Sequence, residues 1–297
     1  MKLTSFYSSS IILSLFILFG CGGSNKSSTA DDVEFSASTE KLSADIDKIL
    51  ADLPNPSEVP YTLQAAAADY NEDLINGLSK VASYQNDEDK AALNLGALST
   101  DMGYLITYEQ VQKSLSYLEA CQKLSETLGV SSVFSNQMVT KFQESQGNRD
   151  TLSSMIDKAV DQAGKTLNDA ERLNVGALIL TGSFVEGLYL AIKVIETYPT
   201  DVLDEQNRNL ILEPLVKIVL DQKKPLLDII SLLEDVSKDE TVADMLNELN
   251  TLKLLYDGDL AEIEKKIMDN TGDFILTQDM LLDITIEVKR IRSKIVG

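Results

Sequence analysis

The residues that could carry chemistry in this chain are carboxylates, lysines, tyrosines and hydroxyls, because the sequence contains no histidine. The absence of histidine excludes Ser-His-Asp and Cys-His catalysis, the usual zinc sites and the Glu-x-x-His pairs of di-iron bundles. No glycine loop with a standard phosphate-binding spacing occurs, and tryptophan is missing too. We therefore expect a non-enzymatic protein without a cofactor; an enzyme that works with carboxylates, lysine or tyrosine alone is the least favoured alternative.

Glu186 is the most conspicuous of the remaining candidates, since it is the one formal charge in the apolar run 173–192. Its helical neighbours include Gly182 and Tyr189, which offer little solvation and some hydrogen bonding. A carboxylate in such a helix needs either a raised pKa or a partner. We favour a structural acid that is bonded to a tyrosine or arginine of another helix. A ligand-binding acid, with Tyr189 beside it, is the alternative.

A second polar and aromatic group is formed by Asp101, Tyr104, Tyr108 and Glu109, which stand on an otherwise apolar helical pattern. Buried polar side chains of this kind usually bond to neighbouring elements, and fewer of them bind ligands. Together with the acid and the tyrosine of the apolar run, these four residues are the candidate polar cluster, either structural or ligand-binding.

The segment 269–273 (DNTGD) resembles a calcium-binding loop in its acidic residues. It fails the EF-hand pattern because Phe274 occupies the place of the required glycine and no glutamate closes the loop. No metal site is predicted.

The run 173–192 would form a helix roughly 30 Å long, which is the width of a domain or of the hydrocarbon layer of a bilayer. Asn174, Thr181, Ser183 and Glu186 would be poorly placed against lipid, and the flanking Lys and Arg residues expected of a membrane span are sparse. We therefore predict a central helix that is buried on all sides by other helices.

Apolar residues recur at helical spacing along the rest of the chain, and no strand alternation or hairpin signal occurs. The predicted fold is all-α, a bundle of about ten helices around the central one, with a kink or split at Pro214. A pattern of helical spacing also follows Pro60 through Leu63, Ala67 and Leu74. The other expected helices are 39–53, 87–107, 108–128, 133–142, 152–167, 202–221, 226–236, 241–256 and 277–295.

An internal echo relates two of these helices, since 173–178 (LNVGAL) matches 93–98 (LNLGAL). A duplication and a chance similarity between apolar helices both explain it. In a true duplication, each copy would be a pair of helices that stacks on the other. The glycines within and just after these two segments are expected to let neighbouring helices approach closely, at a cost of about 1 kcal/mol each in helix propensity. These glycines are Gly96, Gly103, Gly176 and Gly182.

Residues 1–20 have the pattern of a bacterial signal peptide, which consists of a basic start at Lys2, an apolar run over 11–19 and the small Gly20 before Cys21. An export signal of this kind predicts that the protein leaves the cytoplasm. Besides Cys21 only Cys121 remains, so no intrachain disulfide is expected, and we interpret Cys121 as a small buried hydrophobe.

The sequence at 18–21 (LFGC) resembles the lipobox of bacterial lipoproteins, although Phe19 is bulkier than the usual residue there. The resemblance implies cleavage before Cys21, which then carries the acyl chains, palmitate among them. An ordinary signal peptide with a chance cysteine is the alternative. The polar residues that follow suit a flexible tether over 21–38, and a single α-helical domain is expected over 39–297.

Four segments of the chain resemble a family of all-helical lipoproteins of Bacteroidota that carries no assigned activity. They are 90–96 (KAALNLG), 101–104 (DMGY), 108–110 (YEQ) and 181–189 (TGSFVEGLY). The resemblance covers most of the chain after the signal, implies the fold and the location, and brings no catalytic residues. Surface-destined lipoproteins of that phylum often carry acidic residues just after the cysteine. Residues 22–30 have none, so we expect the periplasmic face of the outer membrane, with the cell surface as the alternative.

The formal net charge of −21 disfavours nucleic acid and anionic head groups as partners. The leading functional hypothesis is a membrane-anchored scaffold or binding subunit of an envelope assembly, whose partners are the membrane, through lipid on Cys21, and an envelope protein. The alternative is a small-ligand-binding lipoprotein with an apolar pocket near Glu186 and Tyr189. A large exposed apolar patch would favour the first hypothesis, and an enclosed pocket with converging polar groups would favour the second.

Overall fold

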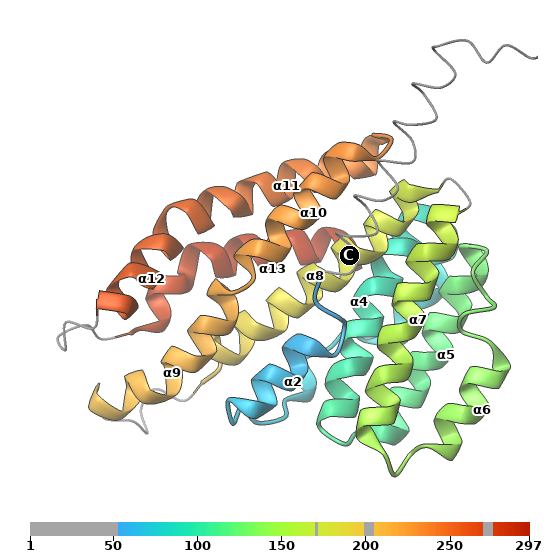
Figure 1. Ribbon diagram of the computed structural model, residues 1–297, viewed down its shortest axis with the longest axis horizontal. Coiled ribbons are helices and arrows are strands. Elements are labelled where there is room, and N and C mark those ends of the chain that lie inside the picture. The colour runs from blue at the N-terminus through green and yellow to red at the C-terminus, as the bar shows by residue number, and fades with distance from the viewer. Residues whose placement is uncertain (1–52, 170–171, 199–204, 270–275) are drawn as a thin grey trace, which may run out of the picture. The chain divides into compact units, whose positions relative to one another are not determined.

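The computed structural model describes residues 53–169, 172–198, 205–269 and 276–297, and these ranges form helices and turns without a strand (Figure 1). All of them belong to one compact unit, Lys41–Gly297. The predicted all-α class is confirmed for this part of the chain. The signal peptide 1–20, Cys21, the tether 21–38, nearly all of the helix 39–53 and most of the acidic loop 269–273 lie outside the described residues.

The elements follow one another as α-helices, with three short 3-10 turns between them. The first half comprises α2 (Glu58–Ala65), η1 (Glu72–Leu74), η2 (Leu78–Lys80), α3 (Val81–Tyr84), α4 (Glu88–Thr107), α5 (Val111–Thr127), α6 (Asn136–Glu144), α7 (Arg149–Asp169) and α8 (Leu173–Glu196). The second half comprises α9 (Glu205–Leu220), α10 (Lys223–Asp235), α11 (Glu240–Asp257), α12 (Asp259–Asp269), η3 (Gln278–Leu281) and α13 (Leu282–Val296).

The structure corrects some of the predicted elements. Helix α2 ends at Ala65, and Ala67 has a φ of 61°, so the helical pattern expected as far as Leu74 is wrong. Helix α9 continues through Pro214, so it is not split there. Helix α12 was not predicted, because Gly258 ends one helical pattern and the short segment behind it is rich in charge.

Helix α8 lies at the centre of the bundle and contacts α2, α4, α7, α9, α10 and α13 (Figure 1). By length and composition it is the one helix, in the part of the chain that is described, that could cross a membrane. However, 94% of its most apolar window is buried inside the protein. The predicted central helix is therefore confirmed as a core helix of this bundle.

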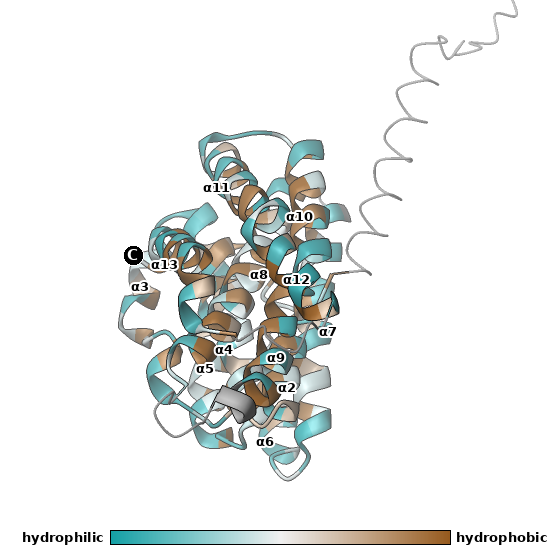
Figure 2. Cartoon of the chain, turned by 90° about the vertical axis from the view of Figure 1, so that its left-hand side faces the viewer, coloured by the Kyte–Doolittle hydropathy of each residue, from teal (hydrophilic) through white to brown (hydrophobic). Residues whose placement is uncertain are grey.

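The amphipathic helices around α8 turn their apolar faces inward. In Figure 2 the hydrophobic colour gathers between the helices, whereas the outer turns of α11, α12 and α13 are hydrophilic. On α13, for example, Ile284, Val288, Ile291 and Ile295 are all buried, at the helical spacing from which this element was predicted.

Two glycines allow the backbones of α4 and α8 to touch. A Cβ atom at Gly96 would lie 2.6 Å from the backbone N of Ser183, and one at Gly182 would lie 2.7 Å from the carbonyl C of Leu93. Each would lie closer still to a carbonyl oxygen of the facing helix. No side chain fits at either position, and the predicted close approach is confirmed for both.

The other two of the four glycines, Gly103 and Gly176, differ from each other. A Cβ atom at Gly103 would lie 2.9 Å from the carbonyl O of Pro56, so this glycine also serves a close approach. At Gly176 an added Cβ would find its nearest neighbours at 3.8 Å, which is ordinary contact, so the prediction is wrong there. The echoed segments lie on two helices that pack together, but their matched glycines have different surroundings.

We predict that Gly182→Ala lowers the free energy of unfolding by about 3 kcal/mol or more, because the methyl group must push two helix backbones apart. Gly176→Ala is the matched control in the same helix. It should change stability by less than about 1 kcal/mol, towards stabilisation, because alanine is the better helix former. Urea unfolding followed by circular dichroism measures both, and equal effects of the two variants would contradict the packing argument.

Candidate functional site

Glu186 is bonded to Arg292, which reaches it from the last helix. The guanidinium Nε donates to Glu186 Oε2 at 2.8 Å, and Nη2 donates to Oε1 at 2.8 Å. Glu186 is 1% exposed, and the side chain of Arg292 is 14% exposed. This bidentate pair is the arrangement in which a buried carboxylate keeps its charge. The interpretation of Glu186 as an acid bonded to an arginine of another helix agrees with this geometry.

Arg292 is held from two further directions. Its guanidinium carbon lies 3.8 Å from the centre of the Tyr189 ring, and Nη2 donates to the carbonyl O of Leu74 at 3.3 Å. Burial lowers the pKa of Arg292, but the charge and hydrogen bonds of Glu186 outweigh this effect and raise that pKa overall. Burial also raises the pKa of the Tyr189 hydroxyl, against the opposing effect of Arg292. Arg292 therefore stays cationic and fills the space between Glu186 and Tyr189.

Asp101 is a second acid beside this pair, and it is completely buried. Its Oδ2 accepts hydrogen bonds from the backbone N of Asn76 at 3.0 Å and from the Asn76 side chain at 2.8 Å. Its Oδ1 has no partner among the residues that the structure describes. Burial raises the pKa of Asp101 well above its ordinary value and the negative charge of Glu186 adds to the rise, while Arg292 and the two hydrogen bonds from Asn76 oppose it.

Tyr104 and Tyr108 belong to a separate group of three tyrosines, which Tyr70 completes. The ring centres of Tyr104 and Tyr108 lie 4.8 Å apart, and those of Tyr70 and Tyr104 lie 5.6 Å apart. Tyr104 accepts a bond from the backbone N of Asn71 at 2.8 Å, and Tyr108 donates to the carbonyl O of Ala68 at 2.7 Å. Burial raises the pKa of both hydroxyls. The hydroxyls of Tyr104 and Tyr108 are therefore engaged, and they hold residues 68–71 against the bundle.

The structure thus divides the six candidate residues. Asp101, Glu186 and Tyr189 meet around Arg292, whereas Tyr104 and Tyr108 join Tyr70. Glu109 belongs to neither group, because it is exposed and takes a φ of 60° where the chain turns from α4 into α5.

Sequence reasoning missed Arg292, Asn76 and Tyr70. A signal for Arg292 existed, because it follows the buried Val288 by one helical turn and so borders the apolar stripe of its helix. Asn76 and Tyr70 lie outside the α-helices and carried no such signal.

Cys121 is buried and free, and its Sγ lies 3.7 Å from the hydroxyl O of Ser99. Burial raises the pKa of this thiol to about 12. A thiol that holds its proton at neutral pH is a poor nucleophile, which agrees with its interpretation as a small hydrophobe.

Comparisons with protein-family models, with curated proteins and with solved structures all found no match. The functional argument therefore depends on the sequence and the geometry of this chain.

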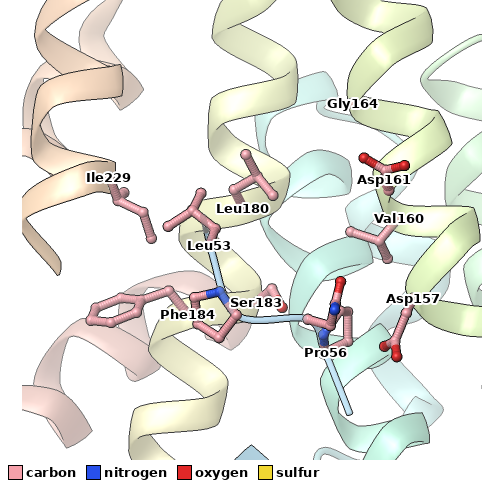
Figure 3. A pocket seen from close by; sticks show the side chains of 12 residues that line it. Leu53, Pro56, Asp157, Val160, Asp161, Gly164, Leu180, Ser183, Phe184 and Ile229 are labelled. Atoms are coloured by element: carbon pink, nitrogen blue, oxygen red, sulfur yellow. The ribbon is translucent and has the colours of Figure 1, made fainter. Parts of the chain in front are cut away.

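Neither Glu186 nor Tyr189 lines any of five pockets along the described residues, although Gly187 lines one of them. Figure 3 shows one of about 40 Å³, with Asp157 and Val160 of α7 on one side and Leu180 and Phe184 of α8 on the other. It has room for a few water-sized groups. More open hollows lie between the segment 55–62 and α7 and between α4 and α11. None of these is lined by Glu186 or Tyr189.

We predict that Arg292→Met lowers the free energy of unfolding by about 3–5 kcal/mol, because it leaves the buried carboxylate of Glu186 without its counter-charge. Lys253→Met is the control, since the ion pair that it breaks with Asp257 is about 40% exposed on both sides. That variant should show no measurable change.

The double variant Glu186→Gln/Arg292→Met removes both charges together and should recover most of the lost stability. Chemical unfolding of all four proteins measures the effect. A double variant as unstable as Arg292→Met would show that the loss does not come from an uncompensated charge.

Proposed function

We propose that this protein is a non-enzymatic scaffold or binding subunit of the bacterial envelope, anchored to a membrane by lipid on Cys21. The observation that carries the proposal is the position of Arg292. Its guanidinium pairs with Glu186 and covers the ring of Tyr189, so it occupies the space that a small ligand would need at this site. This supports contact through the outer helix faces over binding inside the bundle.

The second half of the bundle is the part that we assign to partner contact. Of the seven large hydrophobic side chains that are exposed in the described residues, six lie on α9 to α13, and the other is Tyr61. Leu282 and Ile286 stand one turn apart on α13 and are 53% and 55% exposed. Exposed apolar pairs of this kind suit a protein contact. The six are Leu210, Leu227, Leu254, Met268, Leu282 and Ile286.

The cellular location is proposed from the sequence alone. The lipobox resemblance at 18–21 supports a lipid anchor, and the lack of acidic residues over 22–30 supports the periplasmic face of the outer membrane. The strongly acidic composition makes nucleic acid an unsuitable partner. A family of helical lipoproteins without assigned activity remains the proposed affiliation.

Crosslinking in cells, followed by purification from membranes and mass spectrometry, tests the scaffold role. We expect one envelope protein in a stoichiometric ratio with the wild-type chain. The double variant Leu282→Glu/Ile286→Glu should lose this partner, because two new charges face it. Tyr61→Glu, a charge placed at an exposed apolar side chain of α2, should keep it. A wild-type protein that purifies alone would refute the scaffold proposal.

The anchor has its own test. Replacing Cys21 by serine removes the acyl acceptor, so the protein should move from the membrane fraction to the soluble fraction on cell fractionation. A Cys21→Ser protein that stays firmly on membranes would end the lipoprotein interpretation, and it would do so independently of the partner experiment.

A further inference from the structure

Residues 68–77, called the strap here, connect α2 to α3 and are attached to the bundle mainly by polar side chains of other elements. Ala68 and Leu74 are its fully buried apolar residues, and Tyr70 and Ile75 are partly buried against the core. The two backbone bonds that close the 3-10 turn within the strap are long, at 3.4 Å each. The firm attachments come from α4, α5 and α13. They are Tyr108 to the O of Ala68, Tyr104 to the N of Asn71, Arg292 to the O of Leu74, Tyr117 to the O of Asn76, and Asp101 to Asn76.

Asp101 is the buried carboxyl group among the attachments of the strap, since Glu72 of the strap pairs with Lys113 of α5 at the surface. It accepts both hydrogen bonds of Asn76 through Oδ2, while its Oδ1 is buried without a partner in the described part of the chain. Asn76 is partly exposed, whereas Asp101 is 0% exposed. The strap therefore lies between this carboxyl group and solvent.

The groups that surround Asp101 make its ionised form unfavourable. Glu186 of α8 carries the nearest negative charge, and Arg292 of α13, the nearest positive one, is already engaged by Glu186 in a bidentate pair. When Asp101 is ionised, two buried carboxylates share one guanidinium, and Oδ1 is a bare anionic oxygen without a donor. Hydration through an open strap relieves both effects.

The other titratable groups nearby keep one charge state across the neutral range. Tyr117 and Cys121 of α5 face Asp101, and burial raises the pKa of each, so both stay neutral. Tyr84 of α3 and Tyr189 of α8 face Arg292 instead, and burial raises the pKa of each of them as well. Arg292 stays cationic.

We propose that the strap is a pH-dependent flap, closed while Asp101 holds its proton and opened by the ionisation of Asp101. The direction follows from linkage. The pKa of Asp101 is raised in the folded protein, so the closed strap has its full stability at acidic pH and loses it as the pH rises through that folded-state pKa.

Opening would change an accessible surface of the protein. Ala68, Tyr70, Asn71 and Leu74 of the strap line a pocket of about 280 Å³ together with residues at the end of α8. The same movement would withdraw the Leu74 carbonyl from Arg292 and admit water to the two acids. Opening of the strap would thus couple the external pH to Asp101 and Glu186, the two buried acids near Arg292 in the described residues.

Hydrogen exchange of the purified full chain, measured by mass spectrometry between pH 5 and pH 9, tests the proposal. Rates are corrected for the intrinsic pH dependence of amide exchange. Peptides that cover the strap should lose protection by up to about tenfold per pH unit as the pH rises towards the folded-state pKa of Asp101, and the loss should level off above it, because below that pKa only the open state is ionised. Peptides of α8 should keep their protection, since the core stays folded.

Asp101→Asn is the decisive variant, because its amide oxygen still accepts from Asn76 and the residue cannot ionise. Its strap should stay protected at both ends of the pH range. Asp157→Asn is the matched control, since burial also raises the pKa of Asp157, which is partly buried and bonds to Ser57 and not to the strap. This control should behave as the wild type.

Strap protection that does not change with pH would overturn the proposal. An equal loss in Asp101→Asn, or a parallel loss in α8, would also overturn it. If Asp101→Asn fails to fold, Asn76→Ala serves in its place, because it removes the side-chain donor and should lower strap protection already at pH 5. An Asn76→Ala strap that is protected like the wild type at both pH values would equally refute the flap.

Discussion

The direct backbone contact between α4 and α8 is the constraint on which the rest of this structure depends. Gly96 and Gly182 leave no side chain between the two helices, and a hydrogen bond of 2.8 Å between the hydroxyls of Thr100 and Ser183 extends the contact. Asp101 and Glu186 lie about one turn beyond Gly96 and Gly182, respectively. The close approach that the glycines permit therefore also brings two acids into one buried region, where neither could exist as an isolated charge.

The last helix resolves this electrostatic conflict. Arg292 pairs with Glu186 from a position 106 residues away in sequence, and it lies over Tyr189 and under the Leu74 carbonyl. A buried ion pair adds little net stability, but it is costly to break, so it selects the one position of α13 in which both charges are satisfied. Asp101 is left without a cation of its own, and its two hydrogen-bond donors both come from Asn76. The strap is attached at that point.

The functional argument follows from the same arrangement. The polar groups inside the bundle are mostly engaged with one another, and the arginine occupies the place near Glu186 and Tyr189 where the alternative prediction put a ligand pocket. Exposed apolar side chains concentrate on α9 to α13. Their position supports the proposed contact through the surface, and the lipobox resemblance at 18–21 supports the proposed presentation of that surface from a membrane.

The sequence by itself determined the helical class, the central helix at 173–192, the boundaries of α4 and α5 within a few residues, and the inert character of Cys121. Those properties are local, because apolar periodicity shows which face of a helix must be buried. The strap after α2 was missed because Ala67 adopts a left-handed φ that its own side chain does not favour, and Gly176 was misjudged because spacing does not reveal how near a neighbour passes. Only the tertiary structure decided that Glu186 meets Arg292 and that Asp101 meets Asn76. A contact between distant segments depends on which helix faces pack together, and a one-dimensional pattern of apolar residues is the same for many such packings.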